Sequence, residues 1–157
     1  MNLELDIQNA LDVDTRNLPL PSSVEFEKWV QATLTGRRKI AQLTIRIVTE
    51  PESASLNETY RHKQGPTNVL SFPFECPPEV PIPLLGDLVI CAPVVTREAS
   101  EQEKDVMAHW AHMTIHGVLH LLGFDHNTEQ EAAEMEAIEI TTLANFGFAN
   151  PYEEIEQ

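Results

Sequence analysis

Residues 116–126 constrain the fold of this chain more than any other part of its sequence. Histidines stand at positions 116, 120 and 126, and a glycine stands at position 123. If the segment is helical, His116 and His120 lie one turn apart on the same face. Gly123 suits a helix C-terminus, because glycine readily adopts the left-handed conformation found there. The sequence therefore predicts a helix that ends near Gly123, with His126 turned back toward the other two histidines.

Three imidazoles that meet at one point, without a fourth protein ligand, are typical of a zinc site left open to water or substrate. We interpret three residues as zinc ligands: His116, His120 and His126. Five of the six histidines lie within residues 109–126, so an accidental pair of core histidines is a poorer explanation. Because imidazoles also bind nickel, copper or iron, zinc is the expected metal rather than the only compatible one.

Neighbouring polar residues have open roles. His109 and His112 lie on the same side of the helix as the candidate ligands, but further from the turn at Gly123. We expect these two histidines to support a metal ligand, to face the substrate or to form buried hydrogen bonds, and direct metal binding is the less favoured alternative. Asp125 could orient an imidazole by accepting its second N–H. Alternatively, its carboxylate could stabilise the turn.

The length of 157 residues predicts one domain, residues 1–157, in which 151–157 form a loosely held acidic tail. Cys76 and Cys91 have no metal-like spacing, and a secreted disulfide scaffold would carry more cysteines. The N-terminus lacks a basic start followed by an apolar run, and no segment approaches the ~20 apolar residues of a membrane span. We therefore expect a cytoplasmic protein with no membrane partner, and the oligomeric state stays open.

The net charge of −15 argues against a general nucleic-acid coat protein, which would be basic. The charge is unevenly distributed, because all ten Lys and Arg residues lie between Arg16 and Lys104. Two basic clusters, at residues 37–39 and 61–63, are the places where an anionic substrate would bind. For residues 37–39, ordinary solvated loop charges are the simpler interpretation.

Hydrophobic periodicity predicts strands early in the chain and helices late. Strands are expected at residues 3–7, 43–48, 69–74 and 87–91. Helices are expected from a cap at Ser22 or Ser23 to near Gly36, from Pro51 through Tyr60, and at residues 94–103, 104–122 and 128–146. The prolines between residues 73 and 83 predict an ordered surface loop.

The helix expected at residues 104–122 is apolar nearly all round except for its histidines, so it should be buried. In the helix that follows, Thr128 and Glu131 predict a capping box. Its acidic residues are expected mostly on a solvent-exposed face: Glu129, Glu131, Glu134, Glu136 and Glu139. The elements together predict an α+β fold, in which a small mixed sheet packs against helices and a buried central helix carries the metal ligands.

The spacing H-x-x-x-H-x-x-G-x-x-H is that of the metzincin proteases. Those enzymes carry a glutamate directly after the first histidine, where it acts as the general base in peptide hydrolysis. Gly117 occupies that position here. General acid–base catalysis is typically worth about 10²–10⁴-fold in rate, so the absence of the base disfavours a metalloprotease. A metalloprotease-like hydrolase remains the alternative to be tested.

Three segments of the chain resemble the bacterial YbeY family of metal-dependent endoribonucleases. Residues 116–126 match the family pattern H-G-x-L-H-L-x-G-Y-D-H, with Phe124 where tyrosine is usual. Residues 60–73 resemble its Y-R-x-K…T-D-V-L-S-F-P segment, with Asn68 where aspartate is common. Residues 85–90 provide the third match. Because the three matches occur in order and at compatible spacing, they are far more specific than the histidines alone.

The resemblance implies roles for particular residues. It implies that His116, His120 and His126 hold zinc and that Arg61 is functionally important. Arg61 and His116 are therefore the candidate catalytic residues. A guanidinium is physically suited to this role, because it binds phosphate through a bidentate fork and stabilises developing charge. Without the resemblance, Arg61 would be interpreted as part of a surface ion pair.

The resemblance also implies a substrate and partners. The substrate would be single-stranded RNA, cleaved at phosphodiester bonds during maturation of the 3′ end of small-subunit ribosomal RNA and during ribosome quality control. Because a net charge of −15 opposes the binding of free RNA, we expect a ribosomal partner to position the RNA. A non-enzymatic ribosome assembly factor with a purely structural metal is a further alternative.

Overall fold

The computed structural model describes residues 1–74 and 83–153. Its strands form one sheet in the order β1-β2-β4-β3. They are β1 (Asn2–Asn9), β2 (Ile40–Val48), β3 (Val69–Pro73) and β4 (Leu84–Cys91). β1, β2 and β4 run parallel, whereas β3 pairs antiparallel with β4. The sheet is therefore mixed, as predicted.

The helices lie on both faces of this sheet. They are α1 (Ser23–Leu34), α2 (Glu50–Arg61), α3 (Ala92–Glu101), α4 (Val106–Leu121) and α5 (Glu129–Ala144). On one face, Ile45 of β2 belongs to the main core together with Trp110 and Leu119 of α4. On the opposite face, Val89 of β4 and Leu56 of α2 belong to a smaller core. The predicted α+β class is confirmed.

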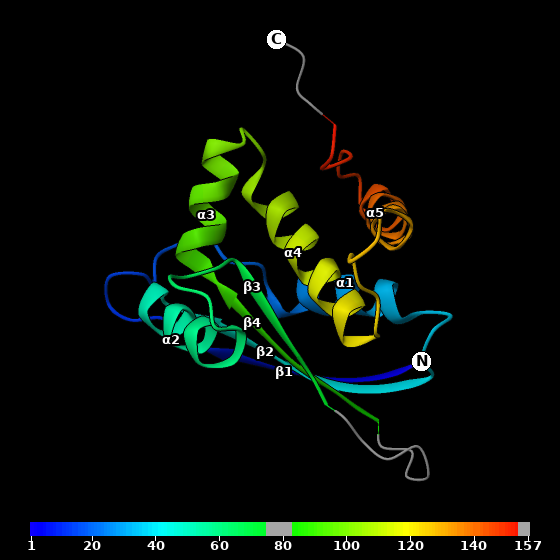
Figure 1. Cartoon of the computed structure of the whole chain (residues 1–157), viewed down its shortest axis with the longest axis horizontal. Coiled ribbons are helices and arrows are strands. Elements are labelled where there is room, and N and C mark those ends of the chain that lie inside the picture. The colour runs from blue at the N-terminus through cyan, green and yellow to red at the C-terminus, as the bar shows by residue number, and fades with distance from the viewer. Residues whose placement is uncertain (75–82, 154–157) are drawn as a thin grey trace.

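α4 is the central helix of the molecule. It contacts α1, α3, α5 and the strands β3 and β4, and Figure 1 shows it passing between α3 and α5. Most of its residues are buried, including Trp110, Ile115 and Leu119. The predicted burial of this helix is confirmed, because a helix that is apolar nearly all round must be covered on every side.

Short-range signals position several helix ends. Thr128 caps α5 by accepting the backbone N–H of Glu131 at 3.1 Å, which is one half of the predicted capping box. The other half does not form, because the Glu131 carboxylate accepts from the Thr128 hydroxyl at 3.1 Å instead of from its backbone N–H. Asp105 caps α4 by accepting the backbone N–H of Met107 at 2.8 Å. α3 begins at Ala92, two residues before the predicted start at Val94, because Pro93 fits the first turn of a helix.

Two predictions fall partly outside the described residues. The proline-rich loop expected between residues 73 and 83 includes residues 75–82, and the acidic tail expected at residues 151–157 includes residues 154–157, and the structure describes neither of these two stretches. Two described residues of this expected tail make specific contacts. Lys104 Nζ donates to the carbonyl of Pro151 at 3.0 Å, and the Tyr152 hydroxyl donates to Glu139 at 2.6 Å. No helix in the described part of the chain is long and apolar enough to cross a membrane.

Candidate metal centre

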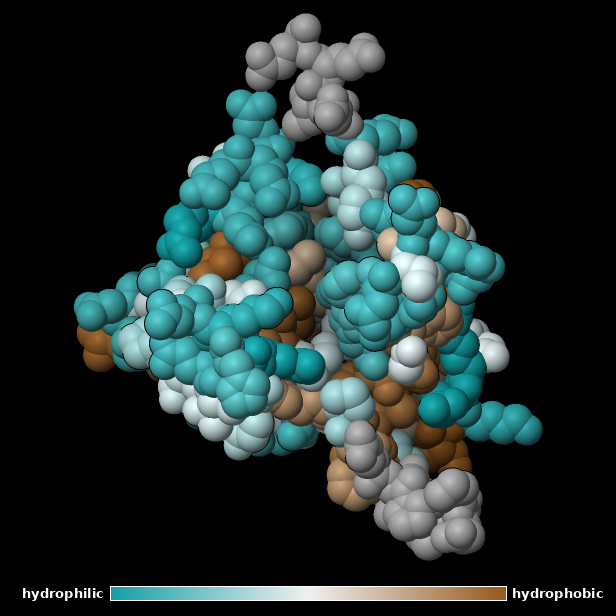
Figure 2. All heavy atoms as spheres, viewed as in Figure 1, coloured by the Kyte–Doolittle hydropathy of each residue, from teal (hydrophilic) through white to brown (hydrophobic). Residues whose placement is uncertain are grey.

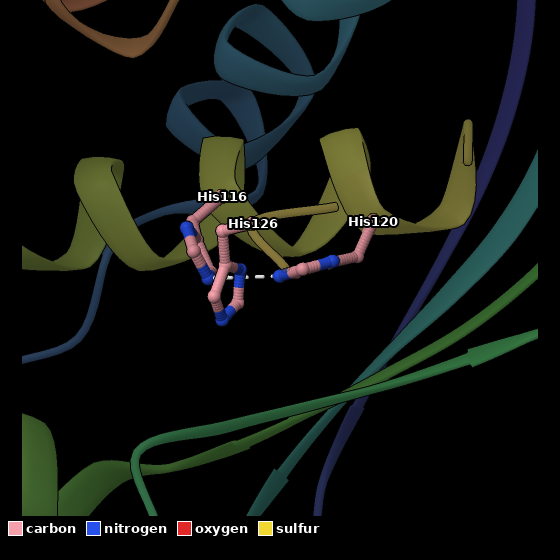
Figure 3. Close-up of side chains that lie close together, drawn as sticks. All are labelled: His116, His120 and His126. Carbon is pink, nitrogen blue, oxygen red and sulfur yellow. Dashed lines mark hydrogen bonds between the residues drawn. The ribbon is translucent and has the colours of Figure 1, made fainter. Parts of the chain in front are cut away.

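The structure brings the three candidate ligands together at the C-terminal end of α4. His116 and His120 project from α4, and His126 approaches them from the segment that follows the helix (Figure 3). One side-chain donor atom from each of the three histidines lies within 4.8 Å of the others. α4 ends as predicted, because Gly123 adopts a φ of 100° and its N–H donates to the carbonyl of His120 at 3.0 Å.

Hydrogen bonds assign the protonation of two of these rings. His116 Nδ1 lies 3.0 Å from a carboxylate oxygen of Glu139, and His120 Nδ1 lies 3.0 Å from the carbonyl oxygen of Phe124. Both oxygens can only accept, so each Nδ1 carries the proton and donates it. In a neutral imidazole, Nε2 then carries a lone pair. Both Nε2 atoms are therefore in the state that a metal ligand requires.

These two lone pairs face each other. The Nε2 atoms of His116 and His120 approach to 3.1 Å, drawn as a dashed line in Figure 3. A hydrogen bond between them would require one imidazole to be doubly protonated and charged. Burial, and after it the nearby His116 and His126, lower the pKa of His120 and oppose that charge. A shared cation resolves the conflict, since two nitrogens bound tetrahedrally to zinc lie about 3.3 Å apart. The implied metal fits these residues.

Glu139 is the functional candidate that sequence reasoning missed. It was expected on the solvent-exposed face of α5, but it is 1% exposed and that expectation is wrong. One carboxylate oxygen accepts from His116, and the other accepts from His112 Nε2 at 2.6 Å. A signal was available, because Glu139 stands four residues after Met135 and four before Leu143, both of which are buried.

The charge state of Glu139 follows from its surroundings. Burial opposes its ionisation, but hydrogen bonds from His112, His116 and the Tyr152 hydroxyl outweigh burial and lower the pKa of the carboxyl to about 2. Burial lowers the pKa of His112, so this histidine donates as a neutral ring. The expectation that His112 forms a buried hydrogen bond is confirmed.

His109 also forms a hydrogen bond, partly buried, in a separate network. Its Nε2 lies 2.9 Å from Glu98 Oε1 of α3, and Asn68 Nδ2 donates to the same oxygen at 3.0 Å. The departure from the family's usual aspartate at position 68 has a physical consequence here. An aspartate would place a second carboxylate against Glu98, whereas the amide of Asn68 supplies a donor.

Asp125 has the second of its two expected roles. Its carboxylate accepts the backbone N–H of His126 at 2.8 Å and the side-chain amide of Asn127 at 2.7 Å. The carboxylate therefore stabilises the turn that presents His126.

A cleft of about 770 Å³ opens beside the histidines. Figure 2 shows this face hollowed between hydrophilic side chains over α2 and those over the end of α4. The residues that line the cleft come from α2, β3, the end of α4 and the segments that follow α2 and α4. They include Arg61, Lys63, Asn68, Ser71, His116, His120, Phe124 and His126. The structure thus brings the candidate residue Arg61 to the same cleft as the three histidines.

Arg61 is held at the wall of this cleft. Its Nη2 donates to the carbonyl of Ser71 in β3 at 2.6 Å, and its guanidinium carbon lies 5.9 Å from the ring centre of Phe72. The bond to Ser71 uses one of five guanidinium N–H donors. The interpretation of Arg61 as half of a surface ion pair is not supported, because its partner is a backbone carbonyl.

One residue of the second basic cluster contacts a residue that lines the cleft. The guanidinium carbon of Arg37 lies 5.8 Å from the ring centre of Phe124, which lines the cleft. Arg37 therefore lies beside a residue of the cleft wall, whereas Arg38 and Lys39 line a separate pocket. The interpretation of Arg37 as a solvated loop charge is incomplete, because its guanidinium also lies over the ring of Phe124.

Gly117 faces the sheet. A Cβ atom placed there would lie 2.7 Å from Leu88 Cδ2 of β4 and 3.2 Å from Val69 Cγ2 of β3. The position at which metzincins carry their general base therefore points into the sheet.

Comparisons with known proteins identify the family of this chain. A family model described as Endoribonuclease YbeY matches residues 12–147. The Endoribonuclease YbeY of Nitrosococcus oceani is 51% identical over 157 residues, which cover 99% of this chain and 100% of that protein. The solution structure of TM1509 from Thermotoga maritima shares the fold, with a TM-score of 0.58 at 19% identity, covering 95% of this chain and 99% of the other. The chain belongs to the endoribonuclease YbeY family.

Proposed function

We propose that this protein is a zinc-dependent endoribonuclease that cleaves single-stranded RNA in the cleft beside His116, His120 and His126. The observation that carries the proposal is the 3.1 Å approach of two imidazole lone pairs, from His116 and His120, in a cleft that also holds Arg61. The printed name of the Nitrosococcus relative supports the same activity.

Each group has a distinct task in this proposal. The three histidines hold the metal, and Asp125 stabilises the turn that presents His126. A zinc ion held there supplies Lewis-acid polarisation of a phosphoryl oxygen. Arg61 binds the same phosphodiester through its remaining N–H donors and stabilises charge that develops on it. The Ser71 carbonyl fixes the guanidinium in advance of binding, so little side-chain freedom is lost when the phosphate arrives.

A peptidase is a weaker candidate. Its general base would have to stand at position 117, where even a methyl group meets Leu88 and Val69. The described residues of the cleft instead combine Arg61 and Lys63 with the imidazoles. This combination of cations and an open metal position suits an anionic phosphodiester.

We further propose that the substrate is small-subunit ribosomal RNA, cut during 3′-end maturation and ribosome quality control in the cytoplasm. The net charge of −15 opposes capture of free RNA, so a ribosomal component would present the RNA to the cleft. In this proposal, residues 1–157 act as one domain.

The test is cleavage of an unstructured RNA oligonucleotide by zinc-loaded protein, with and without a chelator. Chelation, His120→Ala and Arg61→Glu should each reduce the cleavage rate by at least about 10²-fold. Arg16→Glu is a matched control, since it makes the same charge change at an exposed residue and should leave the rate unchanged. Cleavage that survives His120→Ala would contradict the proposal. Equal cleavage of free RNA and RNA within the ribosomal subunit would contradict the role of a ribosomal partner.

A further inference from the structure

Behind the metal centre, a buried carboxylate joins three elements of the fold. Glu139 of α5 accepts from His116 and His112 of α4, and it accepts from the Tyr152 hydroxyl of the C-terminal segment. We propose that Glu139 is a positioning residue that fixes the ring and tautomer of His116 for metal binding, with Tyr152 holding its carboxylate in place. This inference rests on the proposed function through the metal.

Packing does not explain why Glu139 is buried, whereas a role in positioning His116 does. A carboxylate withdrawn from water is costly unless it is fully hydrogen-bonded, and an apolar residue of similar size would often be cheaper. Met135 and Leu143, on the same face of α5, are apolar and buried. Packing alone would therefore favour an apolar residue at position 139. The bonds to α4 distinguish this position from its neighbours.

The link to the metal runs through His116. Its Nδ1 donates to Glu139 at 3.0 Å, while its Nε2 faces His120 Nε2 at 3.1 Å. Without an acceptor at Nδ1, the imidazole can carry its proton on Nε2 instead, which removes the lone pair that the metal needs. Carboxylates that accept the second N–H of a ligating histidine typically contribute 10–100-fold to metal affinity.

The other oxygen of Glu139 is held from two sides. His112 Nε2 donates to Oε2 at 2.6 Å, and the Tyr152 hydroxyl donates to the same atom at 2.6 Å. Burial, and after it the bond to Glu139, raise the pKa of the Tyr152 phenol, so the hydroxyl stays protonated. These two donors fix the plane of the carboxylate and therefore the direction of Oε1 toward His116.

The C-terminal segment reaches this network through specific contacts. The ring of Tyr152 lies 5.4 Å from that of His112, edge to face, and Lys104 Nζ bonds the preceding carbonyl of Pro151 at 3.0 Å. Tyr152 remains 43% exposed, so packing explains little of its placement. The hydroxyl contact with Glu139 is the more specific interaction.

A second metal ion among His112, His116 and Glu139 is the competing interpretation, because their donor atoms also lie within 4.8 Å of one another. The separations of 2.6 and 3.0 Å between nitrogen and oxygen are those of hydrogen bonds. A metal at this place would also have to displace the proton from His116 Nδ1. The hydrogen-bonded network explains the same contacts without that cost.

The experiment is zinc affinity measured by competition with a chromophoric chelator, without RNA. Glu139→Gln should weaken zinc binding 10–100-fold, because glutamine offers one acceptor and one donor where the site needs acceptors on both sides. Tyr152→Phe should weaken it by a smaller factor of about 2–5, since it removes one of two donors to Oε2. Glu134→Gln, an exposed change of the same chemistry on α5, should have no effect.

A second readout separates positioning from general stability. In ¹⁵N spectra of metal-free protein, His116 should carry its proton on Nδ1 in the wild type and should populate the other tautomer in Glu139→Gln. Unchanged zinc affinity and an unchanged His116 tautomer in both variants would overturn the positioning role. Wild-type zinc affinity in His120→Ala would instead overturn the metal centre itself, and with it the proposed function. Binding of two zinc ions, with loss of one in Glu139→Gln, would favour the second-metal interpretation.

Discussion

Gly117 lets α4 pack closely against β3 and β4. In the sequence, this residue mattered because it replaces the general base of the metzincins. In the structure, its α-carbon faces Leu88 and Val69, and a Cβ atom would lie 2.7 Å from Leu88 Cδ2. The side of α4 that carries Gly117 points at the sheet. This one arrangement accounts both for the close packing of α4 and for the absence of a general base at position 117.

This packing predicts that Gly117→Ala destabilises the protein. Overpacking against the fully buried Leu88 should cost about 1–3 kcal/mol. Removing a glycine from a helix offsets about 1 kcal/mol of that cost, so a net loss of about 1 kcal/mol is expected in urea unfolding. In a Leu88→Ala background, which removes the clashing methyl groups, the same change should be neutral or stabilising. A stabilising Gly117→Ala in the wild type would contradict this account.

At the scale of elements, α4 carries a row of histidines along one side, and its neighbours supply the matching carboxylates. Glu98 of α3 binds His109, and Glu139 of α5 binds His112 and His116. The periodicity of α4 indicates that these histidines share a side of the helix. The carboxylates depend on how α3 and α5 pack against it.

The Glu98 network predicts a pH-dependent contribution to stability. The hydrogen bond from His109 is the main cause that lowers the pKa of Glu98 below its usual 4.5; burial opposes it and Asn68 supports it. Because the folded-state pKa is lowered, the contribution is fully present above about pH 4.5 and is lost as pH falls through the folded-state value. Glu98→Gln should therefore reduce the free energy of unfolding by about 1–2 kcal/mol at pH 7 and by less below pH 4.5.

Urea unfolding at several pH values measures this effect. Glu101→Gln, an exposed change on the same helix, is the control and should have no pH-dependent effect. A Glu98→Gln cost that stays constant from pH 7 to pH 3.5 would show that the ionised carboxylate is not the source of the stability.

At the scale of the whole molecule, the metal centre lies at the margin of the core. The main core contains Phe26, Trp29, Trp110 and Leu119, which join α1 and α4, and it extends to the sheet through Ile45. The candidate ligands lie at the end of α4, and His126 is exposed. The metal is therefore expected to serve chemistry rather than to hold the fold.

Metal removal tests this separation. A chelator should abolish RNA cleavage, while helical circular dichroism and a single cooperative unfolding transition persist. The unfolding midpoint should fall by a few degrees, because zinc binds the folded state only. Loss of helical signal on chelation would support the assembly factor with a structural metal, since such sites fold only with their ion.

The sequence by itself determined the local geometry of the metal ligands on α4. The spacing of His116 and His120, with Gly123 after them, predicts the convergence with His126 because a helix turn and its C-terminal cap are set by neighbouring residues. The apolar circumference of the helix likewise predicts its burial. The family motifs, which also depend on short spacings, identify the same residues.

Only the tertiary structure decided the partners of these residues. Glu139 stands 23 positions from His116, and its place beside that histidine depends on how α5 packs on α4. Arg61 reaches the cleft because α2 ends beside the Ser71 carbonyl of β3. The physical reason is that sequence periodicity specifies which face of an element is buried, whereas the neighbour on that face is chosen by the packing of the whole chain.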